Sequence, residues 1–216
     1  MSSDLYTHLM TATLNANAAE VQRLMVLDPT IDGSAALQVA AGQGHVDIVQ
    51  LLMRVSDPLF QESQALFCAL QHNTKCVQLL APVSKIGARH FFMAVDSGCW
   101  DSVATLMGEQ HDPDLVQQSF VRAARFGQVN ILKHLVGCVD PTYKNSLALQ
   151  WALLGNHEAC VDILYPVSDT PAVVAHFEQD KFPPAFLENV KRRMDADRLW
   201  SVVGEVSTRA QSARKI

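Results

Sequence analysis

ALQVAAGQGHVDIVQLL, residues 36–52, returns with substitutions as ALQWALLGNHEACVDIL, residues 148–164. Each copy has an alanine near the end of a first apolar segment, then a polar turn, then a second apolar segment. The same alanine recurs along the chain at Ala12, Ala40, Ala69, Ala94, Ala123 and Ala152. The steps between these alanines are 28, 29, 25, 29 and 29 residues. A nearly constant period of this length is typical of stacked repeats, so we expect an array that offers a binding surface.

The first half of each unit is predicted to be a short helix. In residues 34–58, Leu37, Ala40 and Ala41 have the spacing of one helix face, and alanines there let a neighbouring helix approach closely. Ser34 is the expected N-cap, because its side-chain oxygen can accept a hydrogen bond from a backbone amide of the first turn. Gly44 is the expected C-cap, because glycine adopts positive φ without a steric penalty.

The second half of each unit is predicted to be a helix with a broad apolar face, as suits a helix packed on two sides. In residues 34–58 this face consists of Val46, Ile48, Val49, Leu51 and Leu52. An Asp-Pro pair ends the unit, since proline cannot continue a helix. The pair recurs at Asp28-Pro29, Asp57-Pro58, Asp112-Pro113 and Asp140-Pro141. The predicted fold class is therefore all-α, a solenoid of about six helix-turn-helix units.

The chain resembles the ankyrin repeat family. The resemblance is carried by Ala40-Ala41-Gly42-Gln43-Gly44-His45 and the VDIVQLL that follows at 46–52, with partial copies at 123–127 and 155–158. It covers about residues 5–170 and implies a non-catalytic module that binds other proteins. The period is nearer 29 residues than the roughly 33 of the family, and Ser-Ala-Ala-Leu-Gln at 34–38 replaces the usual T-P-L-H. These departures predict short loops in place of long β-turn fingers.

The domain prediction follows from where the repeat pattern begins and ends. Residues 1–170 form the repeat array, with a polar N-terminal cap repeat at about 5–30. Residues 171–206 form a C-terminal helical cap in which Phe186, Leu187 and Trp200 cover the open end of the stack. A small separate interaction module is the alternative for this segment. Residues 207–216 are expected to be disordered.

Composition excludes several classes of function. The net charge of −5 and pI of about 5.9 argue against general nucleic-acid binding, which needs a basic surface. No apolar run is long enough for a membrane helix, and the N-terminus has no signal-peptide pattern. The five cysteines are odd in number and form no C-x-x-C pair, so we expect neither disulfides nor a zinc ribbon. Cys76 and Cys160 fall at the repeat position of Ile48 and are predicted to be small buried side chains.

Other chemical motifs have a structural interpretation. His45 and His157 occupy the ankyrin turn position, where an imidazole is expected to hydrogen-bond nearby backbone. Gly42-Gln43-Gly44 is not a phosphate loop, because it follows a helix and the third glycine is absent. No histidine pair has metal-ligand spacing, so no metal or cofactor is expected. An enzyme would need a perturbed cluster in a true pocket, for instance Cys68 with His72.

The candidate binding residues are those that vary while the framework repeats. In ankyrin proteins the two residues after the Ala-Ala pair face the concave groove. The predicted partner-binding set drawn from these positions and their neighbours is Gln43, Gln71, His72, Asp96, Arg125, Phe126, Trp151 and Tyr143. Arg125-Phe126 is the favoured anchor, because arginine and aromatic side chains dominate interface energetics. The alternative is a solvated surface with Phe126 tucked against its neighbour.

We therefore expect non-catalytic binding of a protein partner. Three roles remain open: an adaptor inside its own cell, a secreted bacterial effector of a host protein, and an immunity-type inhibitor that occludes an enzyme. The effector alternative comes from repeat endings such as Val55-Ser56-Asp57-Pro58, which are similar to degenerate bacterial ankyrin-type repeats. We expect a monomer in a reducing compartment, the cytoplasm, with signal-independent export left open.

Overall fold

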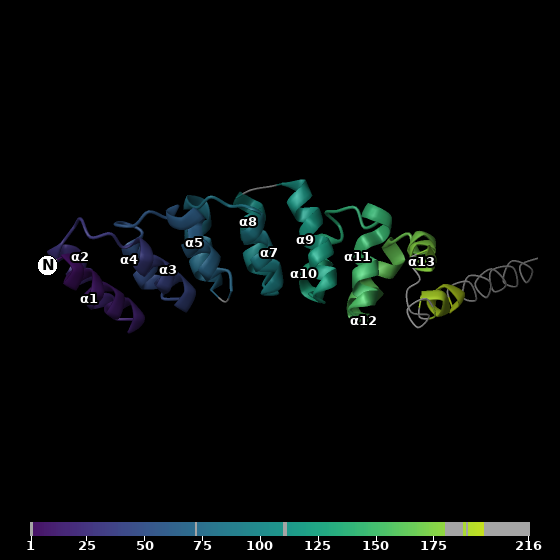
Figure 1. Cartoon of the computed structure of the whole chain (residues 1–216), viewed down its shortest axis with the longest axis horizontal. Coiled ribbons are helices and arrows are strands. Elements are labelled where there is room, and N and C mark those ends of the chain that lie inside the picture. Colours follow the sequence, from purple (N-terminus) through teal and green to yellow (C-terminus); the bar gives the residue numbers. More distant parts are fainter. Residues whose placement is uncertain (1, 72, 110–111, 180–187, 189, 197–216) are drawn as a thin grey trace, which may run out of the picture. The chain divides into compact units, whose positions relative to one another are not determined.

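A computed structural model describes residues 2–71, 73–109, 112–179, 188 and 190–196 (Figure 1). These residues form α-helices and two short 3-10 helices, and no strand is found among them. The predicted all-α class is confirmed. The chain divides into two compact units, one formed by residues up to Ala123 with Gln128–Val139, the other by Ala124–Gly127 with residues from Asp140 onward.

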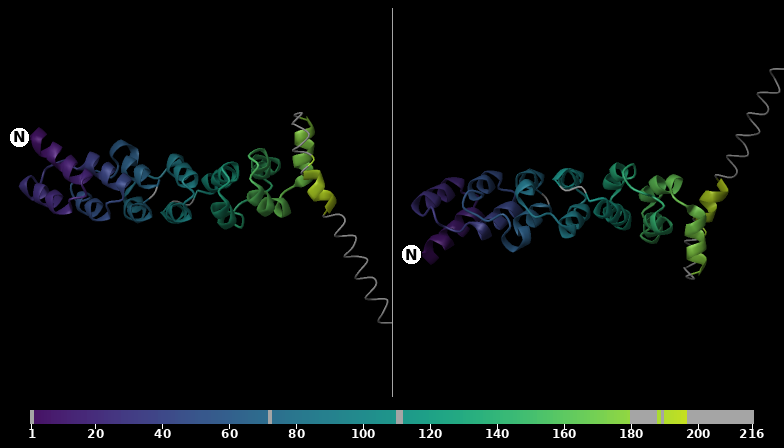
Figure 2. Two further views of the ribbon diagram at one scale, coloured as in Figure 1. Left: turned by 90° about the horizontal axis from the view of Figure 1, so that it is seen from below. Right: turned by 90° about the horizontal axis from the view of Figure 1, so that it is seen from above.

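The first unit consists of helix pairs. Its helices are α1 (Ser2–Leu14), α2 (Ala18–Leu27), α3 (Ser34–Gln43), α4 (Val46–Leu52), α5 (Phe60–Ala69), α6 (Thr74–Leu80), η1 (Ala81–Val83), α7 (Ala88–Asp96), α8 (Trp100–Glu109), most of α9 (Pro113–Arg125) and α10 (Val129–Leu135). Two rows result, because α1, α3, α5 and α7 pack in succession, as do α2, α4, α6 and α8 (Figure 2).

The second unit continues the same alternation. Its helices are α11 (Tyr143–Leu154), α12 (Glu158–Leu164), η2 (Tyr165–Val167) and α13 (Thr170–Gln179), followed by helical residues 190–196. It also contains the last residues of α9 and the turn after them. Helix α11 packs against both α12 and α13.

The recurring alanines form the inner core of the repeats, as predicted. Ala40, Ala69, Ala94, Ala123 and Ala152 have no exposed surface, and Ala12 is 5% exposed. A side chain this small lets neighbouring helices approach closely, and the larger apolar residues fill the space around it. Leu37, Leu66 and Leu149 are fully buried on the same helices, three residues before their alanines. The repeat register read from the sequence is therefore the packing register.

The turn inside the unit also follows the prediction at its glycine. Gly44 has φ +80° and ends α3 through its own amide, which donates to the carbonyls of Ala40 and Ala41. Ser34 differs from the prediction, because the N-cap of α3 is Gly33. The Ser34 hydroxyl instead accepts a hydrogen bond from the Asp57 amide at 3.0 Å, across the loop to the next unit. The hydroxyl also donates to the Asp32 carboxylate at 2.6 Å, so both of its hydrogen bonds lie outside the first turn of α3.

The Asp-Pro pairs have a specific role in the loops. The aspartate side chain accepts a hydrogen bond from the backbone amide two residues later, which closes an Asx turn. This contact is present at Asp28, Asp57, Asp112 and Asp140, with N–O distances of 2.8–3.0 Å. Proline sits between the two partners and restrains φ, so the loop reverses the chain at low entropic cost.

Two inner helices begin with an irregular turn. Residues 61–63 and 144–146 all have φ between 48° and 61°, the left-handed region. In each copy the third residue is a fully buried serine that accepts an amide from the next loop. Ser63 accepts from Lys85 at 2.8 Å, and Ser146 accepts from Asp169 at 2.8 Å. These inter-repeat bonds offset part of the cost of left-handed backbone in non-glycine residues.

The C-terminal segment packs on the second unit as far as it is described. Val173 and Phe177 of α13 are fully buried, and Val190 is 1% exposed. Arg193 binds Asp162 and Glu158 of α12, at 2.6 and 2.5 Å. Phe186, Leu187 and Trp200, which were expected to cover the stack, lie outside the described residues, as does the expected disordered tail. The domain boundaries stay a prediction.

Candidate protein-interaction site

In several repeats, a side chain in the turn between the two helices contacts the preceding repeat. It donates a hydrogen bond to a backbone carbonyl at the end of the preceding inner helix, 31 or 32 residues earlier. The contacts are Asn73 Nδ2 to Ala41 O and Gly42 O (3.0 and 2.9 Å), Gln128 Nε2 to Asp96 O (3.0 Å) and His157 Nε2 to Arg125 O (3.0 Å). Neighbouring repeats are thereby joined by a polar contact as well as by the apolar core.

The expectation for the turn histidines is confirmed for His157 and not for His45. Nε2 of His45 lies 3.0 Å from the Gln43 side-chain oxygen, two residues away. His157 contributes more, because its ring also packs on the turn after α9. A Cβ added at Gly127, which has φ +69°, would lie 2.7 Å from the His157 Nδ1 atom. Gly127 is therefore required both for its backbone conformation and for the space that the imidazole occupies.

Arg125 contacts two aromatic rings at this turn. Its guanidinium carbon is 4.5 Å from the centroid of the Trp151 ring and 5.7 Å from that of Phe126. Arg125 is exposed, Phe126 is 46% exposed and Trp151 is half-buried. A cation over aromatic faces is attracted by the ring quadrupole. The three residues, which we name the Arg125 cluster, form a polar and aromatic surface whose backbone is fixed by His157.

Arg122, one turn earlier on α9, forms an ion pair with a carboxylate of the same chain. Its Nε and Nη2 atoms bind both carboxylate oxygens of Asp96, each at 2.6 Å. The hydrogen bonds that Arg122 donates to the Asp96 carboxylate raise the pKa of Arg122. Its guanidinium also lies 5.0 Å from the Phe92 ring. Asp96 was predicted to contact a partner, and its carboxylate is engaged in this bidentate pair. The sequence reading did not anticipate the pair, because it joins residues 26 positions apart.

The remaining predicted residues belong to other parts of the chain. Gln43 and Gln71 belong to the first unit and are exposed. Tyr143 is the first residue of α11, whereas Trp151 lies near the last, and the Tyr143 ring contacts the Lys144 ammonium group at 5.1 Å. His72 lies outside the described residues. The structure thus brings together Arg125, Phe126 and Trp151 of the predicted set.

A buried histidine in α7 was not singled out from the sequence. His90 is 2% exposed. Its Nδ1 accepts the Gly87 amide at 3.2 Å, so Nε2 carries the proton and donates to the Ser63 carbonyl at 3.5 Å. Burial lowers the pKa of His90, and the neighbouring Arg89 charge lowers it further. A hollow of about 150 Å³ lies beside it, lined also by Glu62, Lys85 and Arg89. The imidazole has structural partners on both nitrogens, which favours a structural role.

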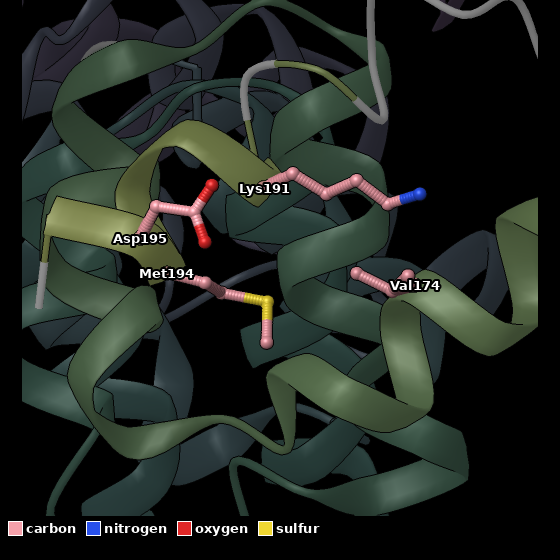
Figure 3. A pocket seen from close by; sticks show the side chains of 4 residues that line it. All are labelled: Val174, Lys191, Met194 and Asp195. Carbon is pink, nitrogen blue, oxygen red and sulfur yellow. The ribbon is translucent and has the colours of Figure 1, made fainter. Parts of the chain in front are cut away.

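A second hollow lies in the C-terminal segment. Its volume is about 240 Å³, and it is lined by Val174, Lys191, Met194 and Asp195. Figure 3 shows the Lys191 ammonium group pointing away from the Asp195 carboxylate, while Met194 and Val174 approach from two sides. Lys191 binds Glu178 at 2.7 Å. These side chains include a cation that is already paired and two apolar groups, so they do not form a set with catalytic or metal-binding chemistry.

The cysteines fit the repeat reading. Cys76 and Cys160 are fully buried, as predicted, and burial raises the pKa of both thiols. Cys68 accepts a weak hydrogen bond from Gln64, and its proposed catalytic partner His72 is outside the described part of the chain. Within that part, no three His, Cys, Asp or Glu side chains are grouped so that they could hold a metal ion. No helix there is long and apolar enough to span a membrane.

Comparison with known families agrees with the geometry. The family description "Ankyrin repeats (3 copies)" matches residues 9–90, the part of the chain that contains α3 to α6. No curated protein matches the chain. Ankyrin repeats are generally protein–protein interaction modules. The match shows ankyrin repeats over residues 9–90, and the helix pairs of this part of the chain agree with it.

Proposed function

We propose that the chain is a non-catalytic protein-binding module whose partner surface includes the Arg125 cluster. The observation that carries the proposal is the placement of the exposed Arg125 guanidinium against Trp151 and Phe126. Tryptophan and arginine are enriched among the residues that dominate binding energy. An exposed phenylalanine beside them adds apolar area that a partner can bury.

Pre-organisation supports the same conclusion. His157 holds the Arg125 carbonyl, and the Trp151 ring restricts the arginine side chain before any partner arrives. A side chain that is already ordered loses less conformational entropy on binding, which improves affinity. The general role of ankyrin repeats in protein interaction is consistent with this mechanism.

The test is capture of partners from the source organism with the tagged full-length chain. The site variant carries Arg125→Glu and Phe126→Ala. A matched control carries Arg54→Glu and Leu27→Ala, the same two changes at an exposed arginine and a 59% exposed leucine of the first unit. All proteins are checked for unchanged helix content and melting temperature.

We expect a partner that the wild type and the control retain and the site variant loses. Retention by all three proteins would refute the location of the site. Failure of the wild type to enrich any protein would contradict the binding function itself. The identity of the partner would then decide between an adaptor, a host-directed effector and an inhibitor of an enzyme.

A further inference from the structure

The Arg125 guanidinium has no acidic partner among the residues that the structure describes. Arg23, Arg89, Arg122 and Arg193 each form an ion pair with a carboxylate. Arg125 forms none among the residues that the structure describes, although the chain has 22 acidic residues and 17 basic ones. Its charge is therefore available to a ligand.

The aromatic rings distinguish Arg125 from other arginines that lack an acid. Arg54 and Arg192 also form no ion pair within the described ranges, and neither lies over an aromatic ring there. Arg125 lies over two. Stacking orients a guanidinium by its face and leaves the edge, with its fork of N–H donors, directed elsewhere. That edge matches the geometry of a carboxylate, which it can bind through two parallel hydrogen bonds.

We propose, on the basis of the protein-binding function above, that Arg125 binds the side-chain carboxylate of an aspartate or glutamate on the partner. Phe126 contacts apolar residues that flank this acid, because nearly half of its surface is exposed beside the guanidinium (46%). The partner segment is therefore an acidic residue within an apolar sequence.

The backbone around the cluster favours a side-chain carboxylate over a chain terminus. Capture of a terminal carboxylate uses a nest of unpaired backbone amides. Here the amides of Gly127 and Gln128 donate to the carbonyls of Ala124 and Ala123 at the end of α9. The Arg125 carbonyl is occupied by His157. The recognising groups that remain are the guanidinium and the two rings.

The contrast with Arg122 supports the assignment. Three positions earlier on α9, a guanidinium also lies near an aromatic ring, and there it holds Asp96 through both carboxylate oxygens. The chain thus contains an internal example of an arginine beside a ring binding a carboxylate in the bidentate manner. At Arg125 the ring contacts recur, and no carboxylate of the described residues pairs with the guanidinium.

The test uses two peptide probes that differ in one group, acetyl-Leu-Glu-Leu-amide and acetyl-Leu-Gln-Leu-amide. The arginine Nε–H signals of the labelled full-length chain are followed by NMR during titration with each peptide. Arg54 serves as the internal control for non-specific attraction of an anion, since it is exposed and contacts neither an aromatic ring nor a carboxylate in the described part of the chain. Arg122 serves as the control for a guanidinium that is already occupied.

We expect a saturable shift of the Arg125 signal with the glutamate peptide, with an affinity roughly tenfold above that for the glutamine peptide. The Trp151 indole signal should shift along the same titration curve, and the Arg125→Gln substitution should abolish this Trp151 shift. Equal affinities for the two peptides, or a shift no larger than that of Arg54, would overturn carboxylate recognition. The capture experiment would be unaffected by that result, so failure of this inference and failure of the proposed function are distinguishable.

Discussion

His157 Nε2 lies 3.0 Å from the carbonyl oxygen of Arg125, 32 residues earlier in the chain. This contact joins the turn of one repeat to the last residue of the preceding inner helix. It places a stabilising bond directly beneath the side chain proposed to bind the partner. Asn73 and Gln128 make the equivalent contact elsewhere, so the register of the repeat, not the residue type, determines the position of the donor.

Replacement of His157 tests this bond. His157→Ala removes the donor and leaves the Arg125 carbonyl without it, which should lower the free energy of unfolding by about 1 kcal/mol or more. His157→Gln should restore most of the loss, because Gln128 binds the Asp96 carbonyl from the same repeat position. The measurement is chemical denaturation of both variants. Equal losses for alanine and glutamine would show that the side-chain donor is unimportant.

Two serines with buried hydroxyl groups, Ser34 at the start of α3 and Ser56 in the loop after α4, give a matched pair. The Ser34 hydroxyl accepts the Asp57 amide, whereas the Ser56 hydroxyl is buried without a hydrogen-bond partner in the described structure. Ser34→Ala should cost about 1–3 kcal/mol, since it leaves a backbone amide unsatisfied. Ser56→Ala should be neutral or stabilising, since it removes a desolvated polar group. Thermal unfolding would decide, and the reverse order of stability would contradict the assignment.

His90 should make stability depend on pH. Its pKa is lowered in the folded chain by burial, so the unfolded chain takes up a proton first as the pH falls. Stability is therefore full above the ordinary histidine pKa of about 6.5 and is lost as the pH falls from there toward the folded pKa. His90→Gln should flatten this part of the curve when the free energy of unfolding is measured from pH 7.5 to 5. Parallel curves for the two proteins would refute the role of His90.

Ala94 tests the packing register. It is fully buried on α7, so a larger side chain would have to displace the residues around it. Ala94→Leu should destabilise the chain by roughly 1–3 kcal/mol through overpacking. Ala159→Leu is the control at an exposed position of α12, with an expected change within about 0.5 kcal/mol. An unchanged melting temperature for Ala94→Leu would mean that the alanine is misplaced in the core.

The local features of the fold could be predicted from the sequence because they repeat. The period identified the buried alanines, the burial of Cys76 and the role of Gly44, each of which depends on residues close in the chain. The function of Ser34 was assigned to the wrong backbone group. A serine before an apolar helix predicts an N-cap, and only the fold shows that the next loop brings the Asp57 amide within 3.0 Å.

At the candidate site, too, some features could be predicted from the sequence and others depend on contacts that only the fold creates. Arg125-Phe126 could be chosen from the sequence, because the pair occupies a variable position in a fixed framework. The bidentate contact of Arg122 with Asp96 could not, since it joins helices of two neighbouring repeats through side chains 26 residues apart. That contact distinguishes Arg122, whose guanidinium binds Asp96, from Arg125, whose guanidinium is proposed to bind a partner.

Photo-crosslinking tests the central claim most directly. Benzoylphenylalanine is introduced in place of Phe126 and, as a control, in place of Val26, which is 74% exposed in the first unit. After irradiation in an extract of the source organism, we expect one partner to be crosslinked at position 126 and not at position 26, and Arg125→Gln should remove the product. A partner crosslinked from position 26 and absent at position 126 would contradict the assignment of the binding surface to the Arg125 cluster.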